Sequence, residues 1–151
     1  MESQVAKPED PAVYDHQATV RRFLDAMVDR DRATLEALVH ADAVWNVPPS
    51  TMPQFRGPHI GKDAIVELVA GAGASMFAPG TARVSIVVQV GNEELSAVQF
   101  RIAGTMPSGV PYDNSYAFFF RFSGAQICEI WENVDTAYVY GKMQISADWL
   151  D

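Results

Sequence analysis

Three carboxylates, Glu129, Glu132 and Asp135, follow one another closely near the C-terminal end of the chain. They come after an aromatic-rich segment, and the stretch 112–135 reads as two long strands that turn at Ser123-Gly124. A carboxyl group beside aromatic side chains can donate or accept a proton where little water is present. The stretch therefore predicts acid/base chemistry in a pocket on a curved sheet.

Alternation along the second strand decides which of these side chains share a face. Residues two apart in a strand point the same way, so Glu129, Trp131, Asn133 and Asp135 are expected to line up. Glu132 is expected to point away from the pocket, toward a partner subunit. A bulge would break this parity, and Glu129 has the alternative of a solvated carboxylate near the turn.

Length and composition favour one compact domain. The chain has 151 residues, of which 48% are hydrophobic, which is ample for a single core. The single cysteine, Cys128, excludes an internal disulfide or a cysteine-built zinc site, and its apolar surroundings predict a small buried side chain, with a reactive thiol as the alternative. His16, His40 and His59 show no metal-ligand spacing, so we expect no metal.

Charge and hydropathy bear on partners and location. A formal net charge of -8, with lysines and arginines scattered, opposes nucleic-acid binding. No apolar run is long enough to span a bilayer, and the N-terminus lacks a signal-peptide pattern. We therefore expect a cytoplasmic protein that binds neither nucleic acid nor a membrane.

The elements that position the carboxylates can be taken in chain order. Residues 1–12 are expected to be a disordered tail. Apolar spacing predicts an amphipathic helix through 20–28, a short helix capped by Asp31, a strand at 43–47, and, after a Pro-rich loop, a third helix from Gly61.

Beyond Thr81 the pattern becomes strand-like. It predicts strands at 83–90 and 95–106, followed by the pair described above, and a short helix after Asp135. Helices first and an antiparallel meander after them indicate an α+β domain over 13–142, with a C-terminal tail at 143–151.

Three segments carry a family resemblance: VWNVPP at 44–49, GKDAI at 61–65, and NSYAFFFRF with ICEIWENVDTAYV within 114–139. They resemble the SnoaL-like group of the NTF2-like superfamily, which includes polyketide cyclases, limonene-epoxide hydrolases and ketosteroid isomerases. The resemblance implies a cone of three N-terminal helices packed on a strongly bent, mainly antiparallel sheet. It also implies a homodimer, and an apolar pocket in which carboxylates transfer protons without a cofactor.

The resemblance also suggests particular residues. Asp135 matches the carboxylate that the cyclases and epoxide hydrolases use as general acid or base. The Arg-x-Asp pair of the hydrolases falls on Gln99 and Arg101, and their Tyr-x-Asn pair on Val44 and Asn46. Epoxide opening by the usual constellation therefore lacks its second carboxylate.

The sequence also departs from the ketosteroid isomerase pattern. The position of the catalytic base in that pattern is occupied by Val47, so the isomerase site is also incomplete. What remains is a single-acid site with Asp135, Asn46 and Arg101 as candidate catalytic residues. Asp135 has the alternatives of capping a helix before Thr136 or forming a structural ion pair with Arg101.

Ten further residues are candidates for the pocket wall. Tyr116 could orient a substrate oxygen, or pack in the core with its hydroxyl satisfied. Trp45 and Phe55 are candidates for wall or lid, and His59 for the pocket mouth. The full set is Trp45, Phe55, His59, Gln99, Asn114, Tyr116, Phe118, Glu129, Trp131 and Asn133.

The function expected from these residues is that of a small cofactor-free enzyme. It would use acid/base catalysis on a hydrophobic oxygenated small molecule, as an isomerase, cyclase or hydratase. One alternative is a non-catalytic ligand-binding or dimerisation module on the same scaffold. A further alternative is an epoxide hydrolase with a rearranged site.

Overall fold

The computed structural model describes residues 13–71 and 76–144. The predicted tail at 1–12 and most of the one at 143–151 lie outside these ranges. The elements, in chain order, are α1 (His16–Asp29), α2 (Arg32–Leu38), β1 (Val39–Asn46), the 3-10 helix η1 (Pro53–Phe55), β2 (His59–Ile60), α3 (Lys62–Ala70), β3 (Arg83–Gly91), β4 (Leu95–Thr105), β5 (Pro111–Ser123), β6 (Gln126–Val134) and α4 (Thr136–Met143).

The first two helices begin at aspartate caps. Asp15 accepts a hydrogen bond of 2.9 Å from the backbone N–H of Ala18, and Asp31 accepts one of 3.1 Å from that of Thr34. The predicted cap at Asp31 is therefore confirmed. Each cap fixes where its helix begins, and burial of the apolar stripe turns the helix toward the sheet.

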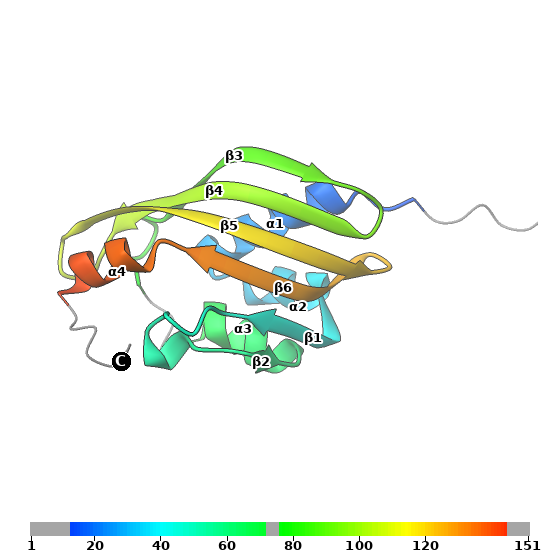
Figure 1. Cartoon of the computed structure of the whole chain (residues 1–151), viewed down its shortest axis with the longest axis horizontal. Helices are drawn as coiled ribbons and strands as arrows, with labels where there is room; N and C mark the ends of the chain where they lie inside the picture. Colours follow the sequence, from blue (N-terminus) through cyan, green and yellow to red (C-terminus); the bar gives the residue numbers. More distant parts are fainter. Residues whose placement is uncertain (1–12, 72–75, 145–151) are drawn as a thin grey trace, which may run out of the picture.

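The six strands form one mixed sheet in the order β2-β1-β6-β5-β4-β3. All neighbours are antiparallel except β1 and β6, which run parallel. The sheet is bent, and α1, α2 and α3 lie on one side of it (Figure 1). The predicted α+β class, the four-strand meander and the helix after Asp135 are confirmed.

Two features of the N-terminal half differ from the prediction. The first strand begins at Val39, four residues before the predicted start at 43. The Pro-rich loop also contains β2, whose His59 pairs with Trp45 of β1. A two-residue strand is too short to produce a visible alternation, so its pairing cannot be read from the sequence.

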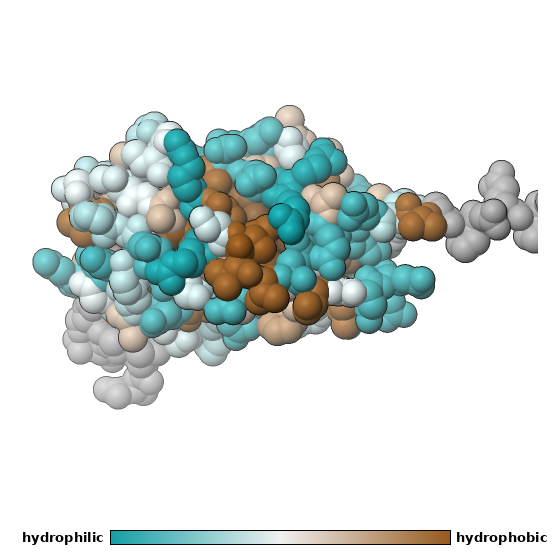
Figure 2. All heavy atoms as spheres, turned by 90° about the horizontal axis from the view of Figure 1, so that it is seen from above, coloured by the Kyte–Doolittle hydropathy of each residue, from teal (hydrophilic) through white to brown (hydrophobic). Residues whose placement is uncertain are grey.

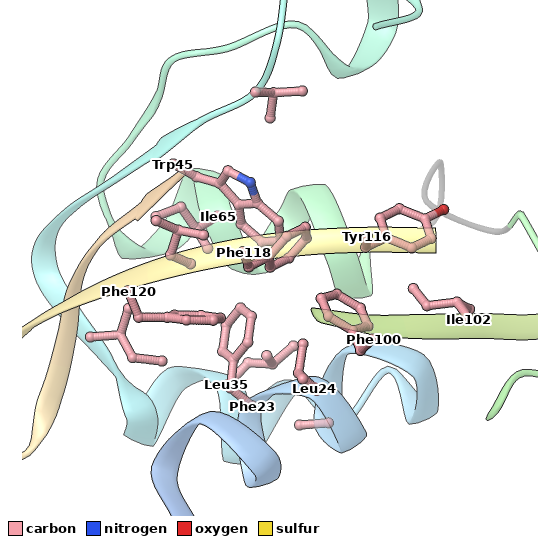
Figure 3. Close-up of a cluster of buried hydrophobic side chains, with 14 of the residues drawn as sticks. Phe23, Leu24, Leu35, Trp45, Ile65, Phe100, Ile102, Tyr116, Phe118 and Phe120 are labelled. Atoms are coloured by element: carbon pink, nitrogen blue, oxygen red, sulfur yellow. The ribbon is translucent and has the colours of Figure 1, made fainter. Parts of the chain in front are cut away.

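The core lies between the helices and the inner face of the sheet. Phe23 of α1 packs against Trp45 and Phe120, with ring centroids 5.8 and 5.6 Å apart. Phe118 in turn contacts Trp45 and Phe100 edge-on. Figure 3 shows these rings between strands and helices, with Tyr116 at the end of the cluster and its hydroxyl oxygen pointing away from it.

The outer face of the sheet carries a band of exposed apolar side chains. Seen from the β3 side, apolar side chains gather between hydrophilic ones (Figure 2). The large exposed hydrophobic residues of β3, β4 and β5 are Val87, Val88, Val90, Leu95 and Phe119. Among the described helices, none has the length and apolar character needed to cross a membrane.

Candidate active site

A cavity of about 340 Å³ opens between the helices and the inner face of the sheet. Its wall is mainly apolar, and α4 closes part of it, since the hydroxyl of Tyr140 donates to the backbone oxygen of Ser50. The apolar lining residues include Met27, Val28, Val47, Met52, Phe55, Leu68, Val69, Met76, Phe77, Ile102, Phe118, Val134 and Val139.

A bulge in β6 decides which carboxylate faces this cavity. Arg121 pairs with Glu129 while the next residue, Phe122, pairs with Ile127, so Cys128 is an extra residue in the ladder. Beyond the bulge, Glu132 pairs with the inward-facing Phe118.

Glu132 accordingly lines the cavity, and the prediction that it points away is wrong. Glu129, Trp131 and Asn133 do share a face, but it is the outer one, where they pair with Arg121, Phe119 and Ala117. Cys128 itself is only partly buried, not enclosed in the core as predicted.

The carboxyl group of Glu132 is held by one hydrogen bond. The indole Nε1–H of Trp45 donates to Glu132 Oε2 over 3.0 Å. The other oxygen, Oε1, has no hydrogen-bond partner within the described residues. Burial in the apolar wall raises the pKa of Glu132 from 4.5 to about 7, and the Trp45 hydrogen bond offsets part of this effect by favouring the anion.

Asp135 lies outside the residues that line the cavity. It is the N-cap of α4, where its Oδ1 accepts a hydrogen bond of 3.1 Å from the backbone N–H of Tyr138. This is the capping alternative considered for it. The role follows from its position: β6 ends at Val134, and a carboxylate that directly precedes Thr136 meets the free N–H groups of the first turn.

The two predicted neighbours of Asp135 lie on the outer face instead. The amide of Asn46 donates to Glu129 Oε1 over 3.4 Å and to the backbone oxygen of Ile130 over 3.3 Å. Arg101 forms an exposed ion pair with Asp113, with Nη2 and Oδ1 2.8 Å apart. The structure therefore does not bring Asp135, Asn46 and Arg101 together in one site.

The remaining candidates divide into two groups. Trp45, Phe55, Tyr116 and Phe118 line the cavity. His59 does not, and its Nε2 bonds the backbone oxygen of Phe55 over 2.9 Å. The others outside the cavity lining are Gln99, Glu129, Trp131 and Asn133 on the outer face, and Asn114, which is buried behind the wall.

Two polar groups of the wall were not singled out from the sequence. Glu132 was assigned to the wrong face, although Ile127 and Ile130, three residues apart, already break strict alternation and signal a bulge between them. No comparable sequence pattern marks Thr51 as a wall residue. It is 7% exposed and its hydroxyl has no partner in the described part of the chain.

Metal chemistry has no ready ligand set in the described part of the chain. Within residues 13–71 and 76–144, no group of three or more His, Cys, Asp or Glu side chains is arranged to hold an ion. The polar side chains of the cavity lining are hydroxyls, the Trp45 indole and the Glu132 carboxyl, together with the exposed Asp29 and Arg30. Such a set can bind an apolar molecule that bears few polar atoms, and can move a proton on it.

Comparison with known proteins agrees with this architecture. A family model described as SnoaL-like domain matches residues 20–130. No curated protein matches the sequence significantly.

Many solved structures share the fold. An NTF2-like protein from Burkholderia pseudomallei superposes with a TM-score of 0.73 at 18% identity, covering 85% of this chain and 97% of its own. A proposed SnoaL-like polyketide cyclase from Jannaschia sp. CCS1 gives 0.72 at 15%, covering 92% and 99%. A protein with a ketosteroid isomerase-like fold from Catenulispora acidiphila, in complex with trimethylamine, gives 0.69 at 17%, covering 87% and 95%. The fold is therefore the NTF2-like α+β cone.

Proposed function

Because this chain belongs to the SnoaL-like domain family, we propose that it is an enzyme that binds an apolar, oxygenated small molecule and moves a proton on it with Glu132. The reaction would be an isomerisation, cyclisation or hydration. Related structures include a proposed polyketide cyclase, which is in keeping with this range.

One observation carries the proposal: the carboxyl of Glu132 lies in an apolar cavity with its pKa raised to about 7. A group with a pKa near the working pH is populated in both its acid and its base form, which suits proton transfer in either direction. Perturbed carboxyl groups inside concave sites are typical of catalytic positions.

The contacts of Glu132 support a defined role for each oxygen. Oε2 accepts from the Trp45 indole, so Oε1 carries the proton when the group is neutral. The indole fixes the orientation of the carboxyl because Trp45 itself is packed between Phe23 and Phe118. A fixed carboxyl group loses little entropy when it meets a substrate C–H or O–H group.

The alternatives make different demands on the same cavity. An epoxide hydrolase needs a second carboxylate to activate water, and the other carboxylate of the lining, Asp29, is exposed. A pure binding module needs the cavity but not the proton transfer. Neither alternative accounts for a carboxyl poised near neutrality.

The test is proton exchange and turnover with a panel of apolar ketones, lactones and epoxides. In D₂O, the wild-type protein should introduce deuterium into at least one member, and Glu132→Gln should reduce the rate about 10²-fold or more. Asp135→Asn, which keeps a helix cap outside the cavity, is the matched control and should keep the rate. Equal rates for wild type and Glu132→Gln would contradict proton transfer by Glu132, and no exchange or turnover by wild type would leave only a binding module.

We also propose that the outer face of the sheet binds a second copy of the chain. The apolar band is bordered by two ion pairs, Arg101 with Asp113 and Arg121 with Glu129. The two charges of each pair balance, so these pairs add no net charge to the face, although the chain carries a net charge of -8. An apolar face bordered by balanced ion pairs can meet its own copy about a two-fold axis with little repulsion.

A further inference from the structure

Arg30 lies at the rim of the cavity, where α1 ends. It belongs to the cavity lining but is exposed to solvent. Its Nη2 donates to the backbone oxygen of Gly71, the residue that follows α3. The guanidinium group is therefore held at the rim, between the ends of two helices.

The same guanidinium group has binding capacity left over. It carries five N–H donors and a permanent positive charge, and the contact with Gly71 uses one donor. Within residues 13–71 and 76–144, Arg30 forms no ion pair. A cation with unused donors at the rim of an apolar cavity can bind an anionic group of a ligand.

The backbone at Arg30 has a conformation that arginine rarely adopts. α1 ends at Asp29 and Asp31 caps α2, so Arg30 alone links the two helices, with φ 56° and ψ 35°. Glycine or asparagine is usual in this left-handed position, because a larger side chain there is strained. Strain of this kind is often retained at binding sites, where the side chain has a function.

The contact with Gly71 gives Arg30 a structural alternative. A cation at a helix C-terminus interacts favourably with the last carbonyl groups, and Arg30 meets the ends of both α1 and α3. That role requires one N–H donor. It does not require the remaining donors of a guanidinium group in the cavity lining.

Arg30 and Glu132 belong to opposite walls of the cavity. Glu132 comes from β6 in the sheet, and Arg30 comes from the end of α1 in the helical layer. The helical part of the wall beside Arg30 is apolar and consists of Met27, Val28, Leu68 and Val69. A ligand that extends from one wall to the other would have a polar group at each end and an apolar body between them.

We propose that Arg30 binds a carboxylate of the ligand at the rim, so that the substrate is an apolar molecule that ends in a carboxylate. The fork of N–H donors in a guanidinium group matches the two oxygens of a carboxylate. Arg30 would be a specificity-determining residue. The inference rests on the proposed function only in that Glu132 acts on the other end of the same molecule.

The second charged residue of the lining favours a carboxylate over a phosphate. Asp29 is exposed in the same lining and has no ion-pair partner within the described part of the chain. Its negative charge repels anions, and a phosphate carries more negative charge than a carboxylate. One positive charge beside one negative charge therefore suits a ligand with a single negative charge.

The test compares four probes with the same apolar body: 4-phenylbutyrate, 4-phenylbutan-1-ol, 4-phenylbutylamine and 4-phenylbutyl phosphate. Calorimetric titration is done at pH 6, where Glu132, with a pKa of about 7, is mostly neutral. Wild-type protein should bind 4-phenylbutyrate at least about 5-fold more tightly than the alcohol. The amine and the phosphate should bind less tightly than 4-phenylbutyrate.

Two substitutions at the rim should act in opposite directions. Arg30→Gln should weaken 4-phenylbutyrate binding to the level of the alcohol and leave binding of the alcohol unchanged. Asp29→Asn should strengthen 4-phenylbutyrate binding about 2-fold, because it removes a repulsive charge. The control is Arg22→Gln, which removes the same charge from an exposed residue of α1 outside the lining and should change neither affinity.

A further variant separates binding from structure. Arg30→Gly should also lose the preference for 4-phenylbutyrate. It should keep a thermal unfolding midpoint near that of wild type, because glycine relieves the strain at positive φ and so offsets the lost hydrogen bond to Gly71. A lower midpoint with an unchanged preference would leave Arg30 with a structural role only and overturn the proposal.

The results distinguish this proposal from the proposed function. A preference that survives Arg30→Gln, tighter binding of the amine or the phosphate, or no preference in wild type, including no binding of any probe, overturns the role of Arg30. Proton exchange that depends on Glu132 would still support the proposed function in that case. A preference that depends on Arg30 in a protein that exchanges no deuterium supports carboxylate recognition and contradicts proton transfer by Glu132.

Discussion

The indole N–H of Trp45 donates to Oε2 of Glu132 over 3.0 Å and joins the parallel strands β1 and β6 across the inner face. The indole is a donor only, so it suits the carbonyl oxygen of the neutral acid as well as an oxygen of the anion. The contact can therefore persist through a change of protonation. A carboxyl group with this property keeps its orientation while its proton leaves and returns.

Stability should depend on the charge of Glu132. Its pKa is raised in the folded protein from 4.5 to about 7, so the folded state binds this proton more tightly than the unfolded state. The contribution of the group to stability is therefore lost as pH rises from about 4.5 to 7, by about 3 kcal/mol in total.

The variant Glu132→Gln stays neutral and can still accept from Trp45. It should match the wild type near pH 4.5 and exceed its unfolding free energy by up to about 3 kcal/mol at pH 8, measured by urea denaturation. Glu129→Gln, the same change on the outer face, should alter stability by no more than about 0.5 kcal/mol. A difference between Glu132→Gln and wild type that does not vary with pH would contradict the burial argument.

Loss of the Trp45 donor should raise the pKa of Glu132 further. The hydrogen bond favours the anion, so Trp45→Phe removes an effect that holds the pKa down and leaves burial unopposed. Carboxyl titration followed by NMR or infrared spectroscopy gives the pKa directly. Phe23→Leu, which disturbs packing beside Trp45 but retains the indole N–H, is the control. An unchanged pKa in Trp45→Phe would mean that the indole does not influence the carboxyl.

Replacement of Asp135 should affect stability and not the cavity. Asp135→Ala removes the acceptor for the Tyr138 N–H and should cost about 0.5–2 kcal/mol, while Asp135→Asn should cost less because Asn also caps helices well. Chemical denaturation measures both. A loss of turnover by Asp135→Asn without a loss of stability would return Asp135 to the catalytic role that the family resemblance suggested.

Charge on the outer face should separate a dimer into monomers. In the double variant Val88→Glu with Phe119→Glu, two carboxylates per chain would be desolvated and opposed to those of the partner copy. Analytical ultracentrifugation should show a dimer for wild type and a monomer for the variant. Ile60→Glu, at an exposed apolar position on β2 at the far edge of the sheet, should remain dimeric. A monomeric wild type at tens of micromolar would rule out the interface.

Local patterns were sufficient to predict most of the fold. The stripe of Val20, Phe23 and Leu24 and the cap at Asp31 mark helices because they depend on short-range spacing. The meander follows from long alternating runs with Gly-containing turns.

The candidate site was harder to predict because it depends on register between strands. Four wall residues were predicted correctly, because large aromatic side chains on core elements are usually buried: Trp45, Phe55, Tyr116 and Phe118. Glu132 was missed because the pocket face was counted back from Asp135, which follows the end of β6 as a helix cap. Counting forward from the buried Ile127 fails as well, because the extra residue Cys128 shifts the facing of Glu129 and the residues after it. Asn46 and Arg101 were misplaced because matching to a family motif gives a strand and not the face of that strand.

The extra residue at Cys128 also affects how a role is transferred from one relative to another by alignment. Two homologous chains can align without a gap through this strand, and yet turn opposite sets of side chains inward if only one of them contains the bulge. Two acidic residues that share an alignment column could then be a catalytic group in one protein and a surface group in the other. Equivalent residues in this family are better identified by the partner they meet, here the indole across from Glu132, than by their position in the sequence.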